Sequence, residues 1–461
     1  MHWANLLTRK AREAPACQVV KSPVRAPSQV EALDANADAL GFPLDAIWLD
    51  IEHTRSKRYF TWDEASFADP GMLARRMGPK GRRLVAIADP HLLIDAQYDI
   101  YAQAANASLL VSAPDSPRLA SANRKREEAV KDSRASHASK NALAGNHPPF
   151  EAQCWPGSSS WVDFLSSRAQ QWWASLYSGA GEDSHQPRWP TWLHAWNDMN
   201  EPSVFSGAEL TLPRDAIHFA PMRRRSAWFR DPRSGDQRIS SWSSGKIQAA
   251  CQIAAPQVDG TCDDTLGTDS ASACISSMNE DERQQSASCV QEQPIEHRLV
   301  HNMYGALQAA ASFAGLNART FAFATSEGLP GSPPQSAHSP KAERPFLLSR
   351  AFFIGSQRHG AVWTGDNTAS WAQLRLAPRM VLALGVAGLP FAGADVGGFF
   401  GIPKPELLLR WYQAAAFMPF FRAHAHLDSP RRDPWLIPEP WVTYVLEAIR
   451  ERQRLLPYLY T

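Results

Sequence analysis

Residues 192–198 read WLHAWND, a short apolar run that ends abruptly in the carboxylate of Asp198. Six further runs have the same form, in which a few apolar residues lead to a charged or imidazole side chain. These six runs are Ala46–Leu49, Leu84–Ile87, Phe346–Ser349, Ala361–Trp363, Val386–Phe391 and Phe417–Phe421. The polar residues that follow the seven runs are Asp50, Asp89, Asp198, Arg350, Asp366, Asp395, and Arg422 with His424. Such apolar runs are typical of parallel strands buried on both faces.

Helix-like stretches separate these runs. Residues 296–313 and 374–384, for example, carry apolar residues at helical spacing. Strands alternating with helices predict an α/β fold with a parallel sheet. Polar residues at the carboxyl ends of the strands favour a (β/α)8 TIM barrel, whose active site gathers there. A doubly wound sheet would need a glycine-rich phosphate turn, whereas residues 393–398 (GADVGG) have an aspartate where the phosphate would sit.

Three loosely patterned segments interrupt the chain at residues 112–148, 222–293 and 324–341. They are rich in Ser together with Pro, Gly, Gln or charged residues, and such compositions cannot bury enough apolar surface to offset chain entropy. We expect them to be disordered insertions in surface loops. The predicted organisation is therefore a catalytic barrel over residues 36–461 with these insertions, preceded by a poorly defined segment at residues 1–35.

Composition excludes several classes of function. The net charge is +1, so no strong field attracts nucleic acid, and no apolar run approaches the ~20 residues of a membrane span. The first residues lack a signal-peptide pattern. Four of the six cysteines fall in the second insertion at spacings that match no zinc motif, and His424 and His426 lack a third ligand. We therefore predict no metal site and no cofactor.

The residues at the predicted strand ends indicate the chemistry. There is neither a nucleophile elbow with a Ser-His-Asp set nor an H-E-x-x-H motif. Two carboxylates facing each other across a tryptophan-rich pocket suit glycoside hydrolysis, and a separation of about 5–5.5 Å would give retention. Asp198 and Asp366, on facing strands, fit this pair. Each acid taken alone could instead cap the next helix, and Arg350 could belong to a structural ion pair, so the whole set carries the argument.

Five longer motifs make the chain similar to a known family. Residues 196–205 (WNDMNEPSVF) and 363–369 (WTGDNTA) resemble the nucleophile and acid/base motifs of glycoside hydrolase family 31. Residues 48–53 (WLDIEH), 393–400 (GADVGGFF) and 420–428 (FFRAHAHLD) resemble more narrowly its members that trim α-1,3-linked glucose from N-linked glycans in the endoplasmic reticulum. The resemblance implies the same barrel fold.

The resemblance assigns roles to residues of this chain. It implies that Asp198 is the nucleophile and that Asp366 is the general acid/base. Arg350 is expected to keep Asp198 ionised, whereas burial and a nearby like charge keep Asp366 protonated. Asp50 and His424 would hold hydroxyl groups of the terminal glucose. The full set of residues expected to bind substrate is Asp50, Ile87, Trp155, Trp196, Met199, Arg350, Trp363, Asp395, Phe399, Arg422 and His424.

The implied function is that of a retaining α-glucosidase acting on an oligosaccharide or N-glycan in the lumen of the endoplasmic reticulum, with a lectin-like β subunit as partner. Alternatives are a maltase, an α-xylosidase or a non-catalytic fragment. Family members carry β domains on both sides of the barrel, and residues 1–30 lack an apolar run like the family's first strand. The chain is therefore expected to be a barrel truncated at its N-terminus.

Overall fold

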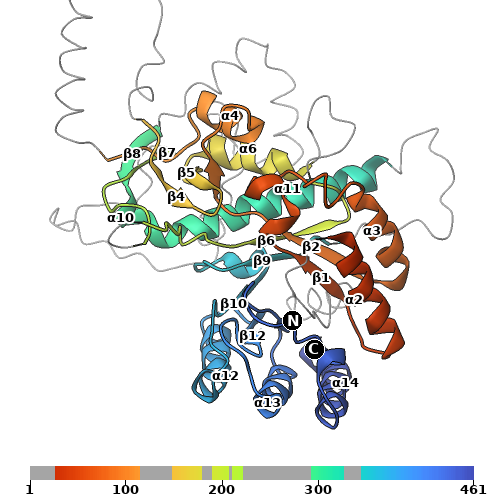
Figure 1. The fold of residues 1–461 in the computed structure, drawn as a ribbon. Helices are drawn as coiled ribbons and strands as arrows, with labels where there is room; N and C mark the ends of the chain where they lie inside the picture. Colours follow the sequence, from red (N-terminus) through yellow and green to blue (C-terminus); the bar gives the residue numbers. More distant parts are fainter. Residues whose placement is uncertain are drawn as a thin grey trace, which may run out of the picture. The chain divides into compact units, whose positions relative to one another are not determined.

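The parallel strands follow one another in space in their order along the chain (Figure 1). The computed structural model describes residues 26–114, 148–178, 189–206, 210–221, 292–326 and 344–460. The chain forms two units, residues 1–219 with 295–461 and residues 220–294, and the sheet belongs to the first. Its strands are β1 (Ala46–Leu49), β2 (Arg83–Ile87), β6 (Leu193–Asn197), β9 (Leu347–Ser349), β10 (Ala361–Trp363) and β11 (Ala392–Gly393).

A seventh strand position continues this sheet. Only Ala394 separates β11 from β12 (Asp395–Val396), and β12 pairs in parallel with β13 (Arg422–Ala423). A doubly wound sheet reverses its strand order at a switch point, which this sheet does not do. The Trp48 ring from β1 lies 6.0 Å from the ring of Phe420, which precedes β13, so the sheet curls until its first and last strands approach. The predicted parallel barrel architecture is confirmed.

Strand register places the polar residues at one edge. Ile87 pairs with Trp196 and Trp196 with Leu348, so β2, β6 and β9 end level with one another. Because the carboxyl ends of parallel strands share an edge of the sheet, Asp89, Asp198 and Arg350 emerge side by side.

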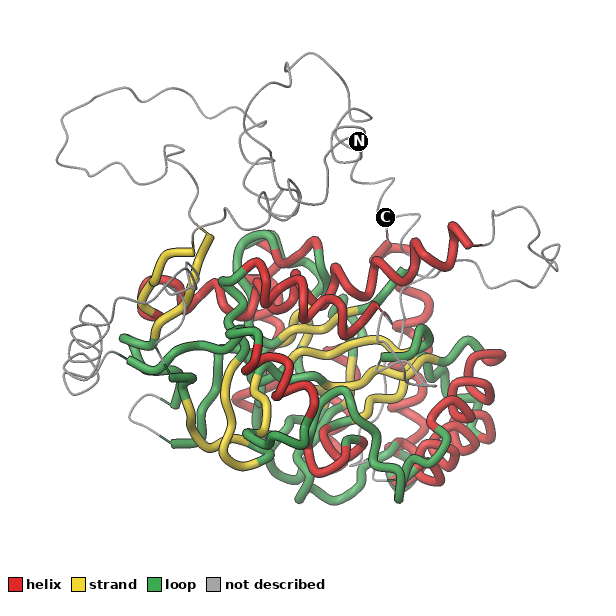
Figure 2. Tube along the Cα trace, turned by 90° about the horizontal axis from the view of Figure 1, so that it is seen from above, coloured by secondary structure: helices red, strands yellow, loops and turns green. Residues whose placement is uncertain are grey.

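The helices lie beside the strands, as Figure 2 shows in a second view. They are α2 (Pro27–Ala39), α3 (Pro70–Met77), α4 (Asp99–Asn106), α6 (Ser167–Ser178), α10 (His297–Val300), α11 (Tyr304–Ser326), α12 (Trp371–Val386), α13 (Pro405–Ala415) and α14 (Trp441–Tyr460). Ser370 begins α12 by accepting a hydrogen bond from the Gln373 amide. Helix α11 packs on α6 so closely that a Cβ at Gly315 would lie 2.1 Å from the Ala174 carbonyl oxygen.

The remaining strands lie outside the parallel sheet. Antiparallel strands β3 (His91–Leu93), β5 (Gly157–Trp161) and β4 (Glu151–Cys154) pair in that order, and β7 (Ile217–Pro221) and β8 (Glu292–Glu296) flank the second predicted insertion. Short 3-10 turns include η1 (Ile51–His53) and η6 (Pro434–Leu436). In the described part of the chain, no helix combines the length and apolar character of a membrane span.

Two predicted strands are displaced. Val386 is the last residue of α12, and the strand predicted at residues 386–391 begins at Ala392. The strand predicted at residues 417–421 begins at Arg422, because the apolar residues before it complete the turn after α13. Short apolar runs do not distinguish a helix end from a strand, so pairing decides. The other five runs coincide with β1, β2, β6, β9 and β10 to within one residue.

The predicted domain limits can be compared with the helices and with the described residues. The predicted boundary between residues 35 and 36 falls inside α2, a helix whose Val30, Leu33 and Ala37 side chains are buried in the core. The insertions predicted at residues 112–148, 222–293 and 324–341 lie outside the described residues, apart from a few residues at their ends.

We expect Arg452→Met to lower the free energy of unfolding by about 3–5 kcal/mol. The buried Arg452 guanidinium of α14 donates to the carbonyls of Ala416, Met418 and Pro419, which would lose their partner. Urea unfolding measures the change. Arg454→Met, on the same helix but 75% exposed, should change it by less than about 0.5 kcal/mol. Equal effects of the two substitutions would contradict this account.

Candidate active site

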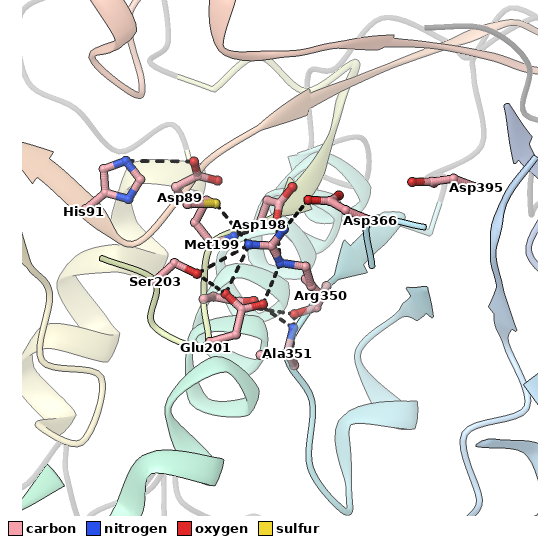
Figure 3. Close-up of polar contacts among 12 residues, drawn as sticks. Asp89, His91, Asp198, Met199, Glu201, Ser203, Arg350, Ala351, Asp366 and Asp395 are labelled. Carbon is pink, nitrogen blue, oxygen red and sulfur yellow. Dashed lines mark hydrogen bonds and ion pairs between the residues drawn. The ribbon is translucent and has the colours of Figure 1, made fainter. Parts of the chain in front are cut away.

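One guanidinium, that of Arg350 after β9, joins the two predicted catalytic carboxylates. Its Nε lies 2.9 Å from Asp198 Oδ1, and its Nη1 lies 3.5 Å from Asp366 Oδ2. Asp198 follows β6 directly, and Asp366 lies three residues beyond β10. Figure 3 shows both acids pointing at Arg350. Strands from different parts of the barrel therefore bring the two acids to a single cation.

A third carboxylate, which the sequence analysis did not select, binds Arg350 most closely. Arg350 Nε donates to Glu201 Oε1 at 2.5 Å, and Nη2 donates to Oε2 at 3.2 Å. Ser203 Oγ donates to the same carboxylate at 2.5 Å. Arg350 Nη2 also lies 3.0 Å from the Met199 sulfur. Glu201 thus fixes the orientation of Arg350. Its position only three residues after Asp198 is the sequence feature that could have identified it as part of the site.

Asparagines fasten the strand ends behind this cluster. Asn200 donates from Nδ2 to Ser349 Oγ at 2.9 Å and accepts from the Ala351 amide at 2.8 Å. Asn197 Nδ2 donates to the Ala88 carbonyl at 2.9 Å. These bonds tie β6 to β2 and β9, so the segment carrying Asp198 is rigidly placed.

The carboxyl of Asp198 is buried, with 12% of its side chain exposed. The pKa of Asp198 is raised to about 6, because desolvation by burial, together with the Asp366 charge, outweighs the opposing effect of Arg350. The Met199 amide donates to Asp198 Oδ1 at 2.7 Å. Arg350 was expected to keep Asp198 ionised by lowering its pKa. Arg350 does lower the pKa, but burial makes the net shift upward.

The carboxyl of Asp366 is more open, with 34% of its side chain exposed. Burial raises its pKa, Arg350 and Arg422 oppose the shift, and Glu201 adds to it. The direction is the one expected for a group that must donate a proton. Glu201 differs: burial would raise its pKa, but Arg350 and Ser203 bring it below the usual value. Their surroundings therefore raise the pKa values of Asp198 and Asp366 and lower the pKa of Glu201.

Asp395 and Arg422 form a second, fully buried pair. Arg422 Nη2 donates to Asp395 Oδ1 at 3.0 Å. The guanidinium carbon of Arg422 lies 4.7 Å from the Trp48 and Trp196 ring centres and 5.1 Å from that of Trp363. Burial raises the pKa of Asp395 to about 7 despite the neighbouring Arg422. Because neither residue is exposed, the pair lies behind the wall formed by the tryptophans.

The predicted apolar walls are largely brought together. The Trp196 ring contacts those of Trp363, at 5.9 Å, and His424, at 5.3 Å. Phe399 lies 5.0 Å from His424, and Ile87 pairs with Trp196 in the sheet register. These rings and the buried Ile87 make one apolar surface at the strand ends.

Two predicted residues have other surroundings. Trp155 lies in the turn between β4 and β5, is 38% exposed, and contacts the Phe205 ring at 4.7 Å. Asp50 accepts a hydrogen bond from the Ile51 amide at 2.7 Å and caps η1, while its contact with the sugar stays a prediction.

Asp89, which follows the second predicted strand, is a further buried acid, and its sequence context does not indicate a role. Asp89 accepts a hydrogen bond from the Tyr59 hydroxyl at 2.5 Å, and the Tyr59 hydroxyl lies 3.2 Å from His91 Nε2. Burial, and next the Asp198 charge, hold the pKa of Asp89 well above its usual range. Tyr59 lies in an irregular loop, and no sequence pattern predicted its contact with Asp89.

The described residues contain no group of three or more His, Cys, Asp or Glu side chains suited to a metal ion. Cys154 is buried and free, and burial raises the pKa of its thiol to about 12. The other five cysteines lie outside the described residues.

If Asp198 acts as a carboxylate, kcat/KM should fall below about pH 6, approaching tenfold per pH unit. The pKa of Asp198 is raised to about 6, so acid converts it to the neutral carboxylic acid. A pH profile of initial rates, with circular dichroism to confirm that the chain stays folded, measures this limb. A kcat/KM that stays constant to pH 4.5 would contradict a required Asp198 carboxylate with a pKa of about 6.

Comparison with known proteins adds to this geometry. The model of the glycosyl hydrolases family 31 TIM-barrel domain matches residues 16–461. Neutral alpha-glucosidase C of Mus musculus is 36% identical over 437 residues, covering 94% of this chain and 34% of the relative. A probable glucan 1,3-alpha-glucosidase of Oryza sativa subsp. japonica is 36% identical over 432 residues, covering 94% and 33%.

Two solved structures agree with this comparison. A crystal structure of the glucosidase II alpha subunit, described as alpha3-Glc2-bound, matches with 34% identity and a TM-score of 0.63, covering 94% of this chain and 34% of that one. A heterodimeric ER glucosidase II complex of the catalytic subunit with the binding domain of its regulatory subunit matches with 32% identity and a TM-score of 0.64, covering 99% and 37%. The chain spans about a third of the length of these proteins.

Proposed function

Because the chain belongs to glycosyl hydrolases family 31, we propose that it is the catalytic barrel of a retaining α-glucosidase. The observation that carries the proposal is the position of Arg350 between two carboxylates, the buried Asp198 and the more exposed Asp366. A buried nucleophile facing a half-exposed proton donor suits a double displacement at a sugar carbon.

In the first step, Asp198 attacks the anomeric carbon of the terminal glucose. A bond forms between its carboxylate oxygen and that carbon, while the glycosidic carbon–oxygen bond breaks. Asp366 transfers its proton to the departing oxygen, so the rest of the substrate leaves as an alcohol. Asp366 is the more exposed of the two side chains, which lets it reach the leaving group.

In the second step, Asp366 acts as a base. It takes a proton from a water molecule, whose oxygen attacks the anomeric carbon as the bond to Asp198 breaks. Two inversions release glucose with its original α configuration. Since the negative charge passes from Asp198 to Asp366 and back, the pair carries one charge throughout, and the Arg350 cation, which Glu201 also binds, lies beside both positions of that charge.

The proposed substrate is an N-linked glycan ending in α-1,3-linked glucose. The support is the similarity to proteins described as glucan 1,3-alpha-glucosidase and as the glucosidase II alpha subunit. We likewise propose the endoplasmic reticulum lumen as the location and a lectin-like β subunit as partner, in line with the heterodimeric relative. A maltase or an α-xylosidase is the alternative within the family.

Proton NMR of the first product tests the reaction. The 461-residue chain is incubated with an aryl α-glucoside, and the anomeric signals are followed before mutarotation mixes them. We expect α-glucose to appear first. Initial appearance of β-glucose would exclude the retaining mechanism, and a cooperatively folding chain that releases no glucose would favour a non-catalytic role.

Competing substrates then test the linkage. We expect an α-1,3-linked glucose disaccharide to be hydrolysed faster than maltose, and an aryl α-xyloside to be the slowest. A preference for maltose or for the xyloside would replace the proposed substrate with the corresponding alternative.

A further inference from the structure

The guanidinium of Arg432 connects the ends of two barrel strands. Arg432 lies between β13 and η6, and all three acceptors of its described hydrogen bonds are main-chain carbonyls. Nη1 donates to Gly397 at 3.0 Å, and Nη2 donates to Gly398 at 2.5 Å and to His424 at 2.7 Å. The glycines follow β12 and the histidine follows β13, so one side chain links both segments.

The Gly397–Gly398 turn is shaped to receive this side chain. Its φ angles are +91° and +87°, which strongly favour glycine. A Cβ at Gly397 would lie 3.1 Å from the guanidinium carbon of Arg432. A Cβ at Gly398 would lie 2.3 Å from the Ala369 amide nitrogen. The turn is therefore packed between Arg432 and the segment that follows Asp366.

Asn367 holds the same turn from its other side. The Phe399 amide lies 2.9 Å from both the main-chain and the side-chain oxygen of Asn367. Asn367 Nδ2 donates to the Asp395 carbonyl at 3.0 Å. Because Asn367 follows Asp366, the turn is fastened on one side to the predicted acid/base segment and on the other to Arg432.

The side chains that this framework carries are two of the residues predicted to bind the sugar, Phe399 and His424. Phe399 follows Gly398, and its ring lies 5.0 Å from the His424 ring, which packs on Trp196. Arg432 binds the His424 carbonyl and the carbonyl just before Phe399, so it holds the main chain from which both rings project. Displacement by a fraction of an ångström changes how well such rings fit a sugar.

We propose that Arg432 is a positioning residue that sets the affinity of the pocket for a terminal glucosyl unit, through the main-chain positions of His424 and Phe399. The inference rests on the proposed function. The planar fork of arginine directs several donors to carbonyls in different directions, whereas an ammonium group is a single point donor. Lysine should therefore keep the charge but lose the geometry.

The test compares Arg432→Lys and Arg432→Gln with wild type in the 461-residue chain. Arg410→Gln, on the surface of α13, is the control, because its side chain is 50% exposed. Three quantities are measured: kcat and KM for an aryl α-glucoside, the inhibition constant for free glucose, and thermal unfolding. We expect both Arg432 variants to raise KM and the glucose inhibition constant by about 10- to 100-fold. The control should stay within about twofold of wild type.

The outcomes separate the two claims. A merely structural role would reduce the folded fraction and the apparent kcat but leave KM and the glucose inhibition constant unchanged, and that result would overturn the inference. If both variants are unfolded at the assay temperature, Arg432 is a stability determinant and the inference is also wrong. A wild-type chain that neither hydrolyses the glucoside nor binds glucose would instead refute the proposed function.

Discussion

Asp198→Asn is expected to lower kcat/KM for an aryl α-glucoside by roughly ten-thousandfold or more. The amide has nearly the shape of the carboxylate, so the buried site should still form. It cannot attack the anomeric carbon, however, and it replaces the negative charge 2.9 Å from Arg350 Nε with a neutral amide. Initial rates under low substrate concentration measure the loss. Asp69→Asn, an exposed carboxylate at the start of α3, should leave kcat/KM within about twofold.

A small external nucleophile distinguishes lost chemistry from lost structure. In Asp198→Gly, azide can occupy the space of the missing carboxylate and attack the anomeric carbon from the same face. A single displacement inverts the configuration, so the expected product is β-glucosyl azide. A folded variant that yields only α-glucosyl azide would show that Asp198 is not the nucleophile.

Asp366→Ala is expected to slow hydrolysis according to how much the leaving group needs a proton. For an α-linked disaccharide, whose alcohol leaves poorly, kcat/KM should fall by about 10³- to 10⁴-fold. For a dinitrophenyl α-glucoside, which leaves without protonation, we expect kcat/KM to fall by about tenfold or less. The loss on the alkaline side of the pH profile should disappear as well, because Asp366 is the group with a raised pKa that must carry the proton.

The product formed with azide completes this second test. Asp198 still forms the covalent intermediate in Asp366→Ala, and azide can open it without a base. Two inversions give α-glucosyl azide, the opposite anomer from the Asp198 variant. An equal loss of kcat/KM for both leaving groups would be incompatible with Asp366 as the general acid.

The strands and the strand-end acids could be predicted because their signals are local. Ala46–Leu49 and Ala361–Trp363 coincide with β1 and β10, since a buried parallel strand must be apolar on both faces. The strand predicted at residues 386–391 was misplaced because that prediction also used only local hydrophobicity. Val386 is apolar and yet 92% exposed at the end of α12, so hydrophobicity alone did not place the strand.

The chemistry of the site depended on distances that no local pattern contains. Arg350 was expected beside Asp198, but its closest carboxylate is Glu201, and burial outweighs its effect on the pKa of Asp198. Desolvation depends on every atom packed around a carboxyl group, which only the folded chain defines.

Sequence by itself therefore determined the class of fold, the edge of the sheet that carries the acids, and the identity of Asp198 and Asp366 as the residues to test. Tertiary structure decided which groups meet: Glu201 with Arg350, and Arg432 with carbonyls of two separate strand ends. Main-chain carbonyls belong to every residue alike, so a bond from Arg432 to Gly398 or His424 leaves no trace in the composition of either segment. Curling of the sheet brings such groups within hydrogen-bonding distance, and that curvature arises from the packing of the whole barrel.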